Sequence, residues 1–442
     1  MKNTLHQIIE DTPQVKAVIV GLNTNKSEDE FERSMNELKE LTKALDIKVA
    51  CTTTQNLPSP DRSTYVGSGK VEEIKGAIEM FDASIVIFND DISSMQIRNL
   101  EKILDTEVID RTGLILQIFA QRAKTRESRL QVEYAQLQYM LPRLVGMRSS
   151  LSRQGGGSGR LSNKGSGEKQ LELDRRRIEH RMAELRRELE AVEKERETQR
   201  GKRIDSGIPK ISLVGYTNAG KSTIMNNLLR LYGGEAFEDK QVLEKDMLFA
   251  TLDTSVRKIA APGKRPFLLT DTVGFISELP HSLVKAFRST LEEAKYADII
   301  LEVIDFADPE YRFHMDVTRE TLAEIGAGDI PVIYVFNKSD LVQDEQRDND
   351  QLVMDVPRTV DDRAYICGKD QGSLDTLIDL IEEKLGADDT MCDMLLPYSE
   401  GGLLNMLNEA GKVKASEYLP EGVKVSAMLS AKEYARFAEY IM

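Results

Sequence analysis

The chain of 442 residues has no tryptophan, three cysteines and four histidines. The cysteines, Cys51, Cys367 and Cys392, are far apart and odd in number, which argues against a disulfide framework and against a cysteine-based metal cluster. No apolar run is long enough to span a bilayer, and residues 1–12 lack the apolar core of a signal peptide. We therefore expect a cytoplasmic protein without an integral membrane segment.

Positive charge is also in deficit. Lysine and arginine total 59 against 74 aspartate and glutamate residues, which gives a formal net charge of -15. This balance argues against indiscriminate nucleic-acid binding by the whole molecule, although the charge is unevenly spread along the chain. The length is sufficient for about two to four domains with ample core.

One glycine-rich stretch, residues 215–223, lies between an apolar run at 211–214 and a helix-like run at 222–231. Its spacing is G-x-x-x-x-G-K-S, in which backbone amides surround phosphate oxygens and the N-terminus of the helix faces the same anion. On this interpretation Lys221 reaches the β- and γ-phosphates and Ser222 binds magnesium. The alternative is a glycine-rich turn that matches by chance. The predicted nucleotide contacts are Gly215, Tyr216, Thr217, Asn218, Ala219, Gly220, Lys221, Ser222 and Thr223.

A magnesium site and a γ-phosphate contact are predicted downstream. Asp271 follows the apolar run 266–270, so its carboxylate lies at a strand end where it can hold the magnesium shell through water. Gly274 can donate its backbone N–H to a γ-phosphate. Thr251 offers a further hydroxyl to magnesium, although Thr254 competes for that role. The predicted metal ligands are Ser222, Thr251 and Asp271, and the predicted catalytic residues are Lys221, Thr251 and Gly274.

Guanine selection is predicted from two further loops. Residues 337–340 follow the apolar run 330–336. The Asp340 carboxylate can accept from the N1–H and the exocyclic amine of guanine, which adenine cannot supply, so the expected ligands are GTP and GDP. A metabolic kinase with the same loop is disfavoured on this ground. The predicted contacts of these two loops are Asn337, Lys338, Asp340, Cys367, Gly368 and Lys369.

Two positions bear on catalysis. Phe275 stands where small signalling GTPases carry the glutamine that orients the attacking water, so we expect slow intrinsic hydrolysis. The missing group would come from a partner, a reordered loop or a cation. Asn218 occupies the position of an asparagine that helps bind potassium in potassium-stimulated GTPases; it either serves K+ here or only braces the loop.

The alternation of strands and helices predicts four parts. Residues 1–120 are predicted to form an N-terminal α/β domain with a parallel sheet, and residues 204–386 a doubly wound P-loop GTPase domain. Residues 387–442 read as a small α+β C-terminal domain. In the first domain, the glycine turn at 65–70 is either an anion site at a helix N-terminus or a structural cap.

The remaining part, residues 121–203, is predicted to be an antiparallel helical hairpin. Apolar residues recur with a heptad rhythm at 130–144 and at 171–192, and neither helix can bury its stripe alone. Pro142 and the glycines of 155–167 form the tip, where basic residues gather. This tip either contacts folded RNA or is a solvated loop. The candidate RNA-binding residues are Arg148, Arg153, Arg160 and Lys164.

Several stretches together give the chain a specific resemblance to the HflX-type translational GTPases. They are residues 65–70, 108–115, 131–144, 165–176 and 271–281. The resemblance implies a GTPase that binds the large (50S) ribosomal subunit and its 23S rRNA, inserts the hairpin tip near the peptidyl transferase centre, and splits or rescues stalled ribosomes. We further expect a monomer that uses Mg2+. It also implies stimulation of hydrolysis by the ribosome, and members of this family have been proposed to bind ATP through the N-terminal domain. The alternative is a GTP-regulated, rRNA-binding assembly module without splitting activity.

Overall fold

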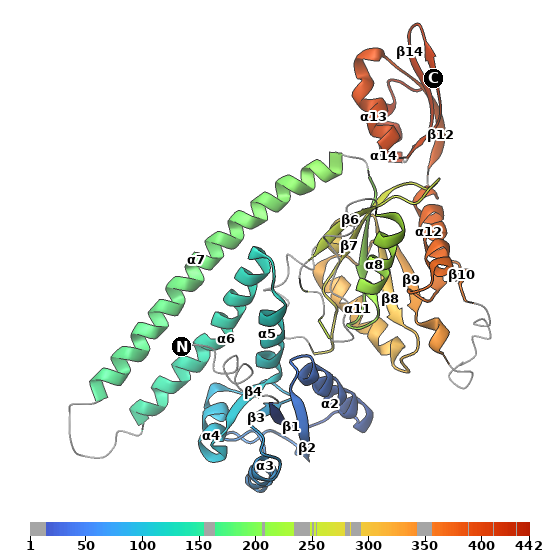
Figure 1. The fold of residues 1–442 in the computed structure, drawn as a ribbon. Helices are drawn as coiled ribbons and strands as arrows, with labels where there is room; N and C mark the ends of the chain where they lie inside the picture. The colour runs from blue at the N-terminus through green and yellow to red at the C-terminus, as the bar shows by residue number, and fades with distance from the viewer. Residues whose placement is uncertain are drawn as a thin grey trace. The chain divides into compact units, whose positions relative to one another are not determined.

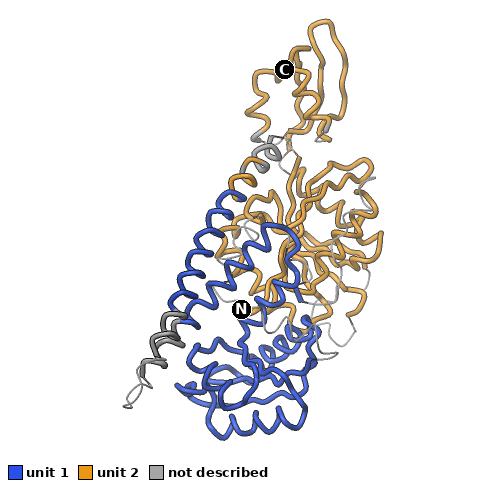
Figure 2. Tube along the Cα trace, turned by 60° about the vertical axis from the view of Figure 1, so that its left-hand side comes forward, with its two compact units in different colours: residues 1–192, 247–249, 278–287 blue, residues 193–246, 250–277, 288–442 orange. Residues whose placement is uncertain are grey.

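The computed structural model contains two compact units (Figure 2). Unit 1 comprises residues 1–192, 247–249 and 278–287, and unit 2 comprises residues 193–246, 250–277 and 288–442. The structure describes residues 15–153, 164–205, 208–233, 248–249, 252, 254–278, 283, 293–342, 356–387, 389–409, 411–429 and 431–442.

Unit 1 is built on a four-stranded, fully parallel sheet with the order β2-β1-β3-β4 (Figure 1). Its strands are β1 (Lys16–Asn23), β2 (Lys48–Asn56), β3 (Ile85–Phe88) and β4 (Glu107–Asp110). Its covering helices are α2 (Glu28–Lys43), α3 (Ser68–Phe81), α4 (Ser94–Leu104) and α5 (Arg111–Arg122). The predicted parallel sheet is confirmed, whereas α4 and β4 were not expected. Strand β4 has only four residues, and the helical spacing of the buried residues in α4 was overlooked.

Local sequence signals explain where these helices begin. Ser27 caps α2 and forms a capping box with Glu30, and Ser93 does the same for α4 with Gln96. The side chain of Asp110 accepts from the amide of Gly113 and so caps α5. These caps satisfy amides that a helix leaves without partners at its N-terminus.

Helices α6 (Arg126–Arg153) and α7 (Lys164–Asp205) form the predicted antiparallel hairpin. Two bonds fix the direction, because the partner on α7 comes earlier as the position on α6 advances: Arg126 with Glu188 (3.3 Å) and Glu133 with Arg181 (2.7 Å). Arg186 also donates to Tyr134 at 2.9 Å. The apolar stripes of α6 and α7 were predicted to bury one another. In the structure, α6 also packs on α4 and α5.

Unit 2 contains a seven-stranded sheet with the order β10-β11-β9-β8-β5-β7-β6. Neighbouring strands are parallel except at the edges, where β6 runs antiparallel to β7 and β10 to β11. The strand order reverses beside β5, so the loop after β5 lies at a switch point where α/β sheets bind ligands. The strands are β5 (Lys210–Val214), β6 (Ser255–Ile259), β7 (Phe267–Asp271), β8 (Ile299–Asp305), β9 (Val332–Asn337), β10 (Arg358–Val360) and β11 (Arg363–Tyr365).

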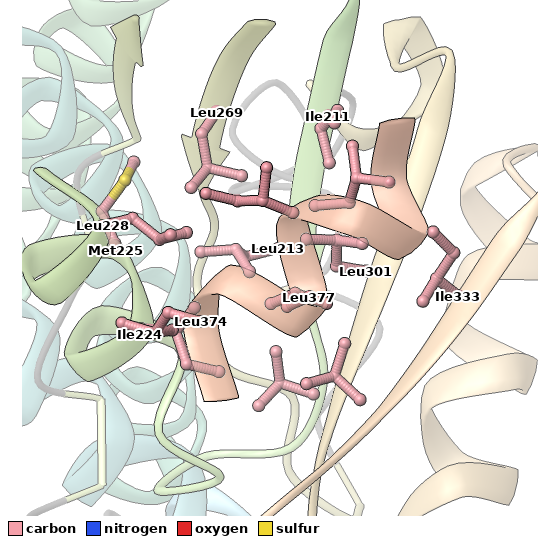
Figure 3. Packing of buried hydrophobic residues seen from close by; sticks show 14 of the residues in the cluster. Ile211, Leu213, Ile224, Met225, Leu228, Leu269, Leu301, Ile333, Leu374 and Leu377 are labelled. Atoms are coloured by element: carbon pink, nitrogen blue, oxygen red, sulfur yellow. The ribbon is translucent and has the colours of Figure 1, made fainter. Parts of the chain in front are cut away.

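The strands of this sheet and the helices that pack on it enclose an apolar cluster (Figure 3). Leu213 of β5, Leu228 of the following helix and Leu377 near the end of the domain are all fully buried. This burial fixes the strand that carries the glycine-rich loop, because each such side chain stabilises the fold by about 1.5–3 kcal/mol. The helices are α8 (Lys221–Tyr232), α11 (Tyr311–Ile325) and α12 (Gln371–Gly386), with short 3-10 turns η2 (Ala294–Tyr296) and η3 (Ser339–Leu341).

The C-terminal part of unit 2 is the predicted small α+β element. Its antiparallel sheet has the order β12-β14-β13, with Met394, Val425 and Phe437 in the core. The elements are β12 (Thr390–Leu396), η5 (Tyr398–Glu400), α13 (Gly401–Glu409), β13 (Val413–Leu419), β14 (Gly422–Leu429) and α14 (Ala431–Phe437). Strand β13 was not predicted, because its residues are exposed on both faces and show no alternation. Among the described residues, no helix has the length and apolar character needed to cross a bilayer.

Candidate nucleotide-binding site

The loop between β5 and α8 is held in a shape that requires its two outer glycines. Gly215 has φ +136° and Gly220 has φ +97°, in the left-handed region that disfavours other residues. A Cβ on Gly215 would lie 2.2 Å from the Val303 carbonyl oxygen, and one on Gly220 would lie 2.2 Å from Asn337 Nδ2. Asn218 lies between them on the exposed side of the loop, with φ +62°.

The N-terminus of α8 is open to an anion. Its N-cap is Gly220, which makes no side-chain hydrogen bond, whereas Asp370 caps α12 through its carboxylate. The first amides of α8 and the positive end of the helix dipole therefore face the glycine loop rather than a capping side chain. This is the arrangement that binds phosphate.

Lys221 lies inside this loop with 6% of its surface exposed. Its Nζ donates to the carbonyl oxygens of Gly215, at 2.9 Å, and Tyr216, at 2.6 Å. Burial lowers the pKa of the ammonium to about 8, while the negative charge of Asp271 acts in the opposite direction. A phosphate group beside Lys221 would favour its charged form.

Ser222 and Asp271, both predicted metal ligands, are brought together. Ser222 Oγ donates to Asp271 Oδ2 at 2.9 Å, and Asp271 is fully buried at the end of β7. A hydroxyl and a carboxylate are the hard oxygen donors that Mg2+ prefers, so the pair fits this ion. The third predicted ligand, Thr251, lies outside the described residues. Its competitor Thr254 accepts a hydrogen bond from Arg196 of α7 at 3.2 Å.

Gly274 lies directly against the phosphate loop. A Cβ on Gly274 would be 2.7 Å from Thr217 Cγ2 and 3.1 Å from Lys221 Nζ. The backbone of Gly274 can approach the space around the lysine only because it carries no side chain. This close approach is what a γ-phosphate contact from the Gly274 amide requires.

Asn337 joins two loops that are far apart in the sequence. Its Nδ2 donates to the Ala219 carbonyl oxygen at 2.8 Å, and its Oδ1 accepts from the amide of Gly368 at 2.8 Å. Asn227 of α8 adds a third bond, from Nδ2 to the Gly368 carbonyl oxygen at 3.0 Å. Sequence reasoning missed Asn227, because only the folded sheet brings it to that loop.

The predicted base-binding loops lie together around this bridge. Lys338 has φ +61° and pairs with Asp305 at 2.6 Å, and Asp340 lies exposed in η3. Lys369 is exposed, and Thr223 lies in the first turn of α8. Burial raises the pKa of the Cys367 thiol, and Asp340 raises it further.

Gly368 explains part of the departure from the usual Ser-Ala-Lys sequence. A Cβ there would lie 2.8 Å from Ile224 Cγ1 and 3.0 Å from Asn337 Oδ1, so even the alanine of the usual sequence would require these neighbours to shift. The amide of Cys367 donates to Ser373 Oγ at 3.1 Å. The backbone of this loop is therefore held in place without a serine at position 367.

Phe275 is buried, with 2% of its surface exposed. Its amide donates to the Gly215 carbonyl oxygen at 3.1 Å, and its carbonyl oxygen accepts from the Thr217 amide at 2.8 Å. The backbone of this position therefore pairs with the phosphate loop while the side chain is withdrawn from solvent. No group on Phe275 can orient a water molecule.

Three of the four candidate RNA-binding residues lie on described parts of the hairpin helices. Arg148 and Arg153 lie in the last turns of α6, and Lys164 begins α7. Their side chains, and Arg160 altogether, lie outside the described residues, so their role stays a prediction.

Family models cover most of the chain. Residues 32–120 match a model described as GTP-binding GTPase N-terminal, and residues 122–203 match GTP-binding GTPase Middle Region. Residues 210–338 match a model described as 50S ribosome-binding GTPase. The last of these contains the glycine loop, Asp271, Gly274 and Asn337, which establishes a P-loop GTPase fold for unit 2.

Individual relatives extend the similarity to nearly the whole chain. GTPase HflX of Lacrimispora saccharolytica is 43% identical over 424 residues, covering 96% of this chain and 96% of that protein. GTPase HflX of Escherichia coli is 37% identical, covering 90% of each chain. A GTP-binding protein from Sulfolobus solfataricus, crystallised with GDP, is 26% identical over 83% of this chain and 97% of that chain, with a TM-score of 0.43. The chain therefore belongs to the HflX GTPase family, and its activity is the binding and hydrolysis of GTP.

Proposed function

We propose that this GTPase binds the large ribosomal subunit in its GTP-bound form and splits or rescues stalled ribosomes. The observation that carries the proposal is the extent of the similarity, since the relation to HflX GTPases covers 96% of the chain and not the nucleotide domain alone. The description 50S ribosome-binding GTPase supports the same partner. The alternative is a GTP-regulated module that binds rRNA during ribosome assembly.

In this proposal the nucleotide site works through charge and position. The amides of α8 and Lys221 hold the β- and γ-phosphates, and Gly274 donates to the γ-phosphate. Ser222 and Asp271 would hold Mg2+, with Thr251 as the third group; the ion would neutralise charge that develops on the phosphate oxygens. Phosphoryl transfer depends largely on such positioning and electrostatic stabilisation.

The base site is proposed to select guanine through Asp340. The carboxylate is exposed and available to N1–H and the exocyclic amine, while Lys338 and Asn337 hold the surrounding backbone. The loop at 367–369 would contribute its backbone to the base oxygen. Adenine would leave the carboxylate without donors, and that loss is the source of discrimination.

The group missing at Phe275 is proposed to come from the ribosome or from a bound cation. The burial of Phe275 supports this, because the segment offers no other side chain at the position of the usual glutamine. K+ near Asn218 would place positive charge beside the phosphates. If K+ serves this role, replacing it by Na+ should lower the hydrolysis rate.

The hairpin is proposed to act against rRNA near the peptidyl transferase centre. Its two helices form a stiff arm, and the candidate contacts Arg148, Arg153, Arg160 and Lys164 are at or near its tip. Arginine and lysine bind phosphates and stack on exposed bases, which suits folded RNA such as 23S rRNA. The net charge of -15 would keep such binding confined to this region.

The experiment that tests the proposal measures GTP hydrolysis by the purified protein with and without large ribosomal subunits, in potassium buffer and with ATP as a competitor. Strong stimulation by the subunits, unaffected by ATP, is expected. Absence of stimulation would contradict the ribosomal proposal and leave the guanine-nucleotide activity intact.

A deletion of residues 150–166 separates the two candidate functions. A splitting factor keeps its basal hydrolysis and loses splitting when the tip is removed, whereas an assembly module shows no splitting before or after the deletion. A matched control replaces Arg187 and Lys194 by alanine, since both are exposed on α7 further from the tip. This control is expected to retain splitting.

A further inference from the structure

We propose that Tyr216 and Glu278 are positioning residues that hold the segment after Gly274 from two sides. Through them, a change of nucleotide at Gly274 is transmitted to helix α2 of unit 1. The coupling acts within this chain, does not depend on a ribosome, and is therefore independent of the proposed function.

The first anchor is the side chain of Tyr216 in the phosphate loop. Its Oη accepts a hydrogen bond from the Ser277 amide at 2.8 Å. Its ring is itself fixed, because it stacks on His314 of α11 with centroids 3.9 Å apart and planes 17° from parallel. His314 Nδ1 in turn lies 3.7 Å from an Asp308 carboxylate oxygen. A residue of the phosphate loop thus holds the end of the Gly274 segment.

The second anchor is the next residue, Glu278, which belongs to unit 1. Its carboxylate accepts from Ser34 Oγ at 3.0 Å and from Lys26 Nζ. Burial by itself would raise the pKa of this carboxyl group, but the bond from Lys26 and the charge of Arg111 bring it below its usual value. Glu278 has φ +52°, so its backbone is also set in an uncommon conformation.

The place where Glu278 docks is part of a wider network in unit 1. Ser34 lies on α2 and is buried; its Oγ also accepts from Asn89 Nδ2 at 2.8 Å. Arg111 Nη1 donates to Asn89 Oδ1 at 3.0 Å and its guanidinium pairs with Glu37 of α2. A displacement of Glu278 therefore acts on α2 through bonded side chains rather than on an isolated surface contact.

A second segment of the nucleotide-domain sequence is held in unit 1 as well. Phe249, two residues before Thr251, is buried and belongs to unit 1. Its ring packs edge-to-face on that of Phe119 of α5, with centroids 4.7 Å apart and an angle of 81° between the ring planes. Thr251 is the predicted magnesium ligand and Gly274 the predicted γ-phosphate contact. A residue close to each of them in the sequence, Phe249 and Glu278, thus belongs to unit 1. This independent contact supports the same coupling.

The chain leaves little slack between the two anchors. Ser277 and Glu278 are adjacent, and their Cα atoms stay about 3.8 Å apart, so the bonds of each residue limit the positions open to the other. The Phe275 backbone bonds to Gly215 and Thr217 restrict the other end of the segment. We infer that a movement of the Gly274 amide toward a phosphate displaces this segment and so alters the bonds at the anchors.

The test is hydrogen exchange of α2, Glu28–Lys43, with GDP and with a non-hydrolysable GTP analogue bound to the full chain. In the native protein, exchange of α2 amides is expected to differ between the two nucleotides by about fivefold, the effect of one hydrogen bond. Glu278→Gln should reduce this difference to within about twofold while GDP affinity stays unchanged. Glu320→Gln, exposed on α11, is the matched control and should keep the full difference.

Tyr216→Phe tests the other anchor, since it removes the Oη acceptor and keeps the ring on His314. It should reduce the α2 difference, and adding Glu278→Gln should give little further loss because both act on one segment. Ser34→Ala serves if Glu278→Gln does not fold, as judged by circular dichroism. An α2 difference that is absent in the native protein, or that persists unchanged in the folded Glu278 or Ser34 variant, would overturn the proposal.

Discussion

Each of the two larger sheets has a glycine turn between a strand and the next helix, and the two turns differ in the bonds that hold them. At the start of α8, Gly215 and Gly220 have positive φ and Lys221 is buried in the loop. At the start of α3, Gly67 has φ -65° and its amide donates to Gln55 Oε1 at 2.9 Å. Neither helix has a side-chain cap, so an uncapped N-terminus alone does not distinguish them.

The lysines of the two turns show the same contrast. Lys70 pairs with Glu73 one turn along α3 at 2.6 Å, whereas Lys221 donates only to carbonyl oxygens of its own loop among the described residues. In the turn before α3, the Gly67 amide and the Lys70 ammonium group are therefore already bonded to other side chains of the protein. This favours the structural interpretation of that turn, and ATP binding by the N-terminal domain stays a prediction. Glycine spacing is a weaker signal than the backbone geometry it permits.

The largest expected effect comes from exchanging the two lysines for alanine in separate variants. Lys221→Ala should lower single-turnover GTP hydrolysis by about 10²–10³, because it removes the charge beside the phosphates. Lys70→Ala should leave the rate within about twofold, as an exposed ion pair contributes little. A comparable loss from Lys70→Ala would end the distinction between the turns.

Asp340→Asn should weaken GDP binding by about 10²-fold, since the amide nitrogen cannot accept from the guanine donors. Calorimetric titration with GDP and with ADP measures the selectivity directly. Asp316→Asn is the control, because Asp316 is a 65% exposed partner of Arg319 on α11. Unchanged GDP affinity in the Asp340 variant would contradict the proposal that Asp340 binds the guanine base.

Alanine at the glycines should act in opposite directions. Gly220→Ala should destabilise unit 2 by about 1–3 kcal/mol, since φ is +97° and the new Cβ would meet Asn337 Nδ2. Gly69→Ala should stabilise α3 by about 0.5–1 kcal/mol, because nothing lies within 4 Å of its Cβ position. Urea denaturation, followed by the fluorescence of a probe introduced in each unit, measures the two changes in the free energy of unfolding separately. A change of the same sign in both variants would contradict this prediction.

The smallest effect is a proton taken up on nucleotide binding. The pKa of Lys221 is about 8 in the protein alone and must rise beside a phosphate. At pH 8.5, GDP binding should therefore take up about three quarters of a proton, and at pH 7 only about a tenth. Affinity should fall as pH rises through 8. Calorimetry in buffers of different ionisation enthalpy measures the uptake, and equal uptake at both pH values would assign the proton elsewhere.

Much of the nucleotide site follows from local sequence because its residues sit at strand ends and in one loop. The apolar strands before residues 215, 271 and 337 place these loops on one edge of a parallel sheet, as the structure shows. The roles of the individual residues stay predictions. Strand β13 was not predicted because a strand exposed on both faces shows no alternation. Helix α4 was not predicted although its buried residues recur at every fourth position.

The contacts of Tyr216, Asn227 and Glu278 could not be predicted in the same way. Their hydrogen bonds join positions separated by 61 to 252 residues, and nothing in the local spacing marks the partner. Asn337 was recognised as part of a base-binding motif, but its bonds to Ala219 and Gly368 depend on the strand order. Long-range pairing of polar side chains is the part of the site that sequence patterns leave undetermined.

The two bonds of Asn337 have a kinetic consequence for the protein. One side chain fixes the phosphate loop at Ala219 and the base loop at Gly368, and it is 3% exposed. The conformational entropy of ordering these loops is therefore lost during folding and not when a nucleotide arrives. Nucleotide association is expected to proceed without a slow ordering step, so that differences in affinity between GTP and GDP arise mainly in their residence times.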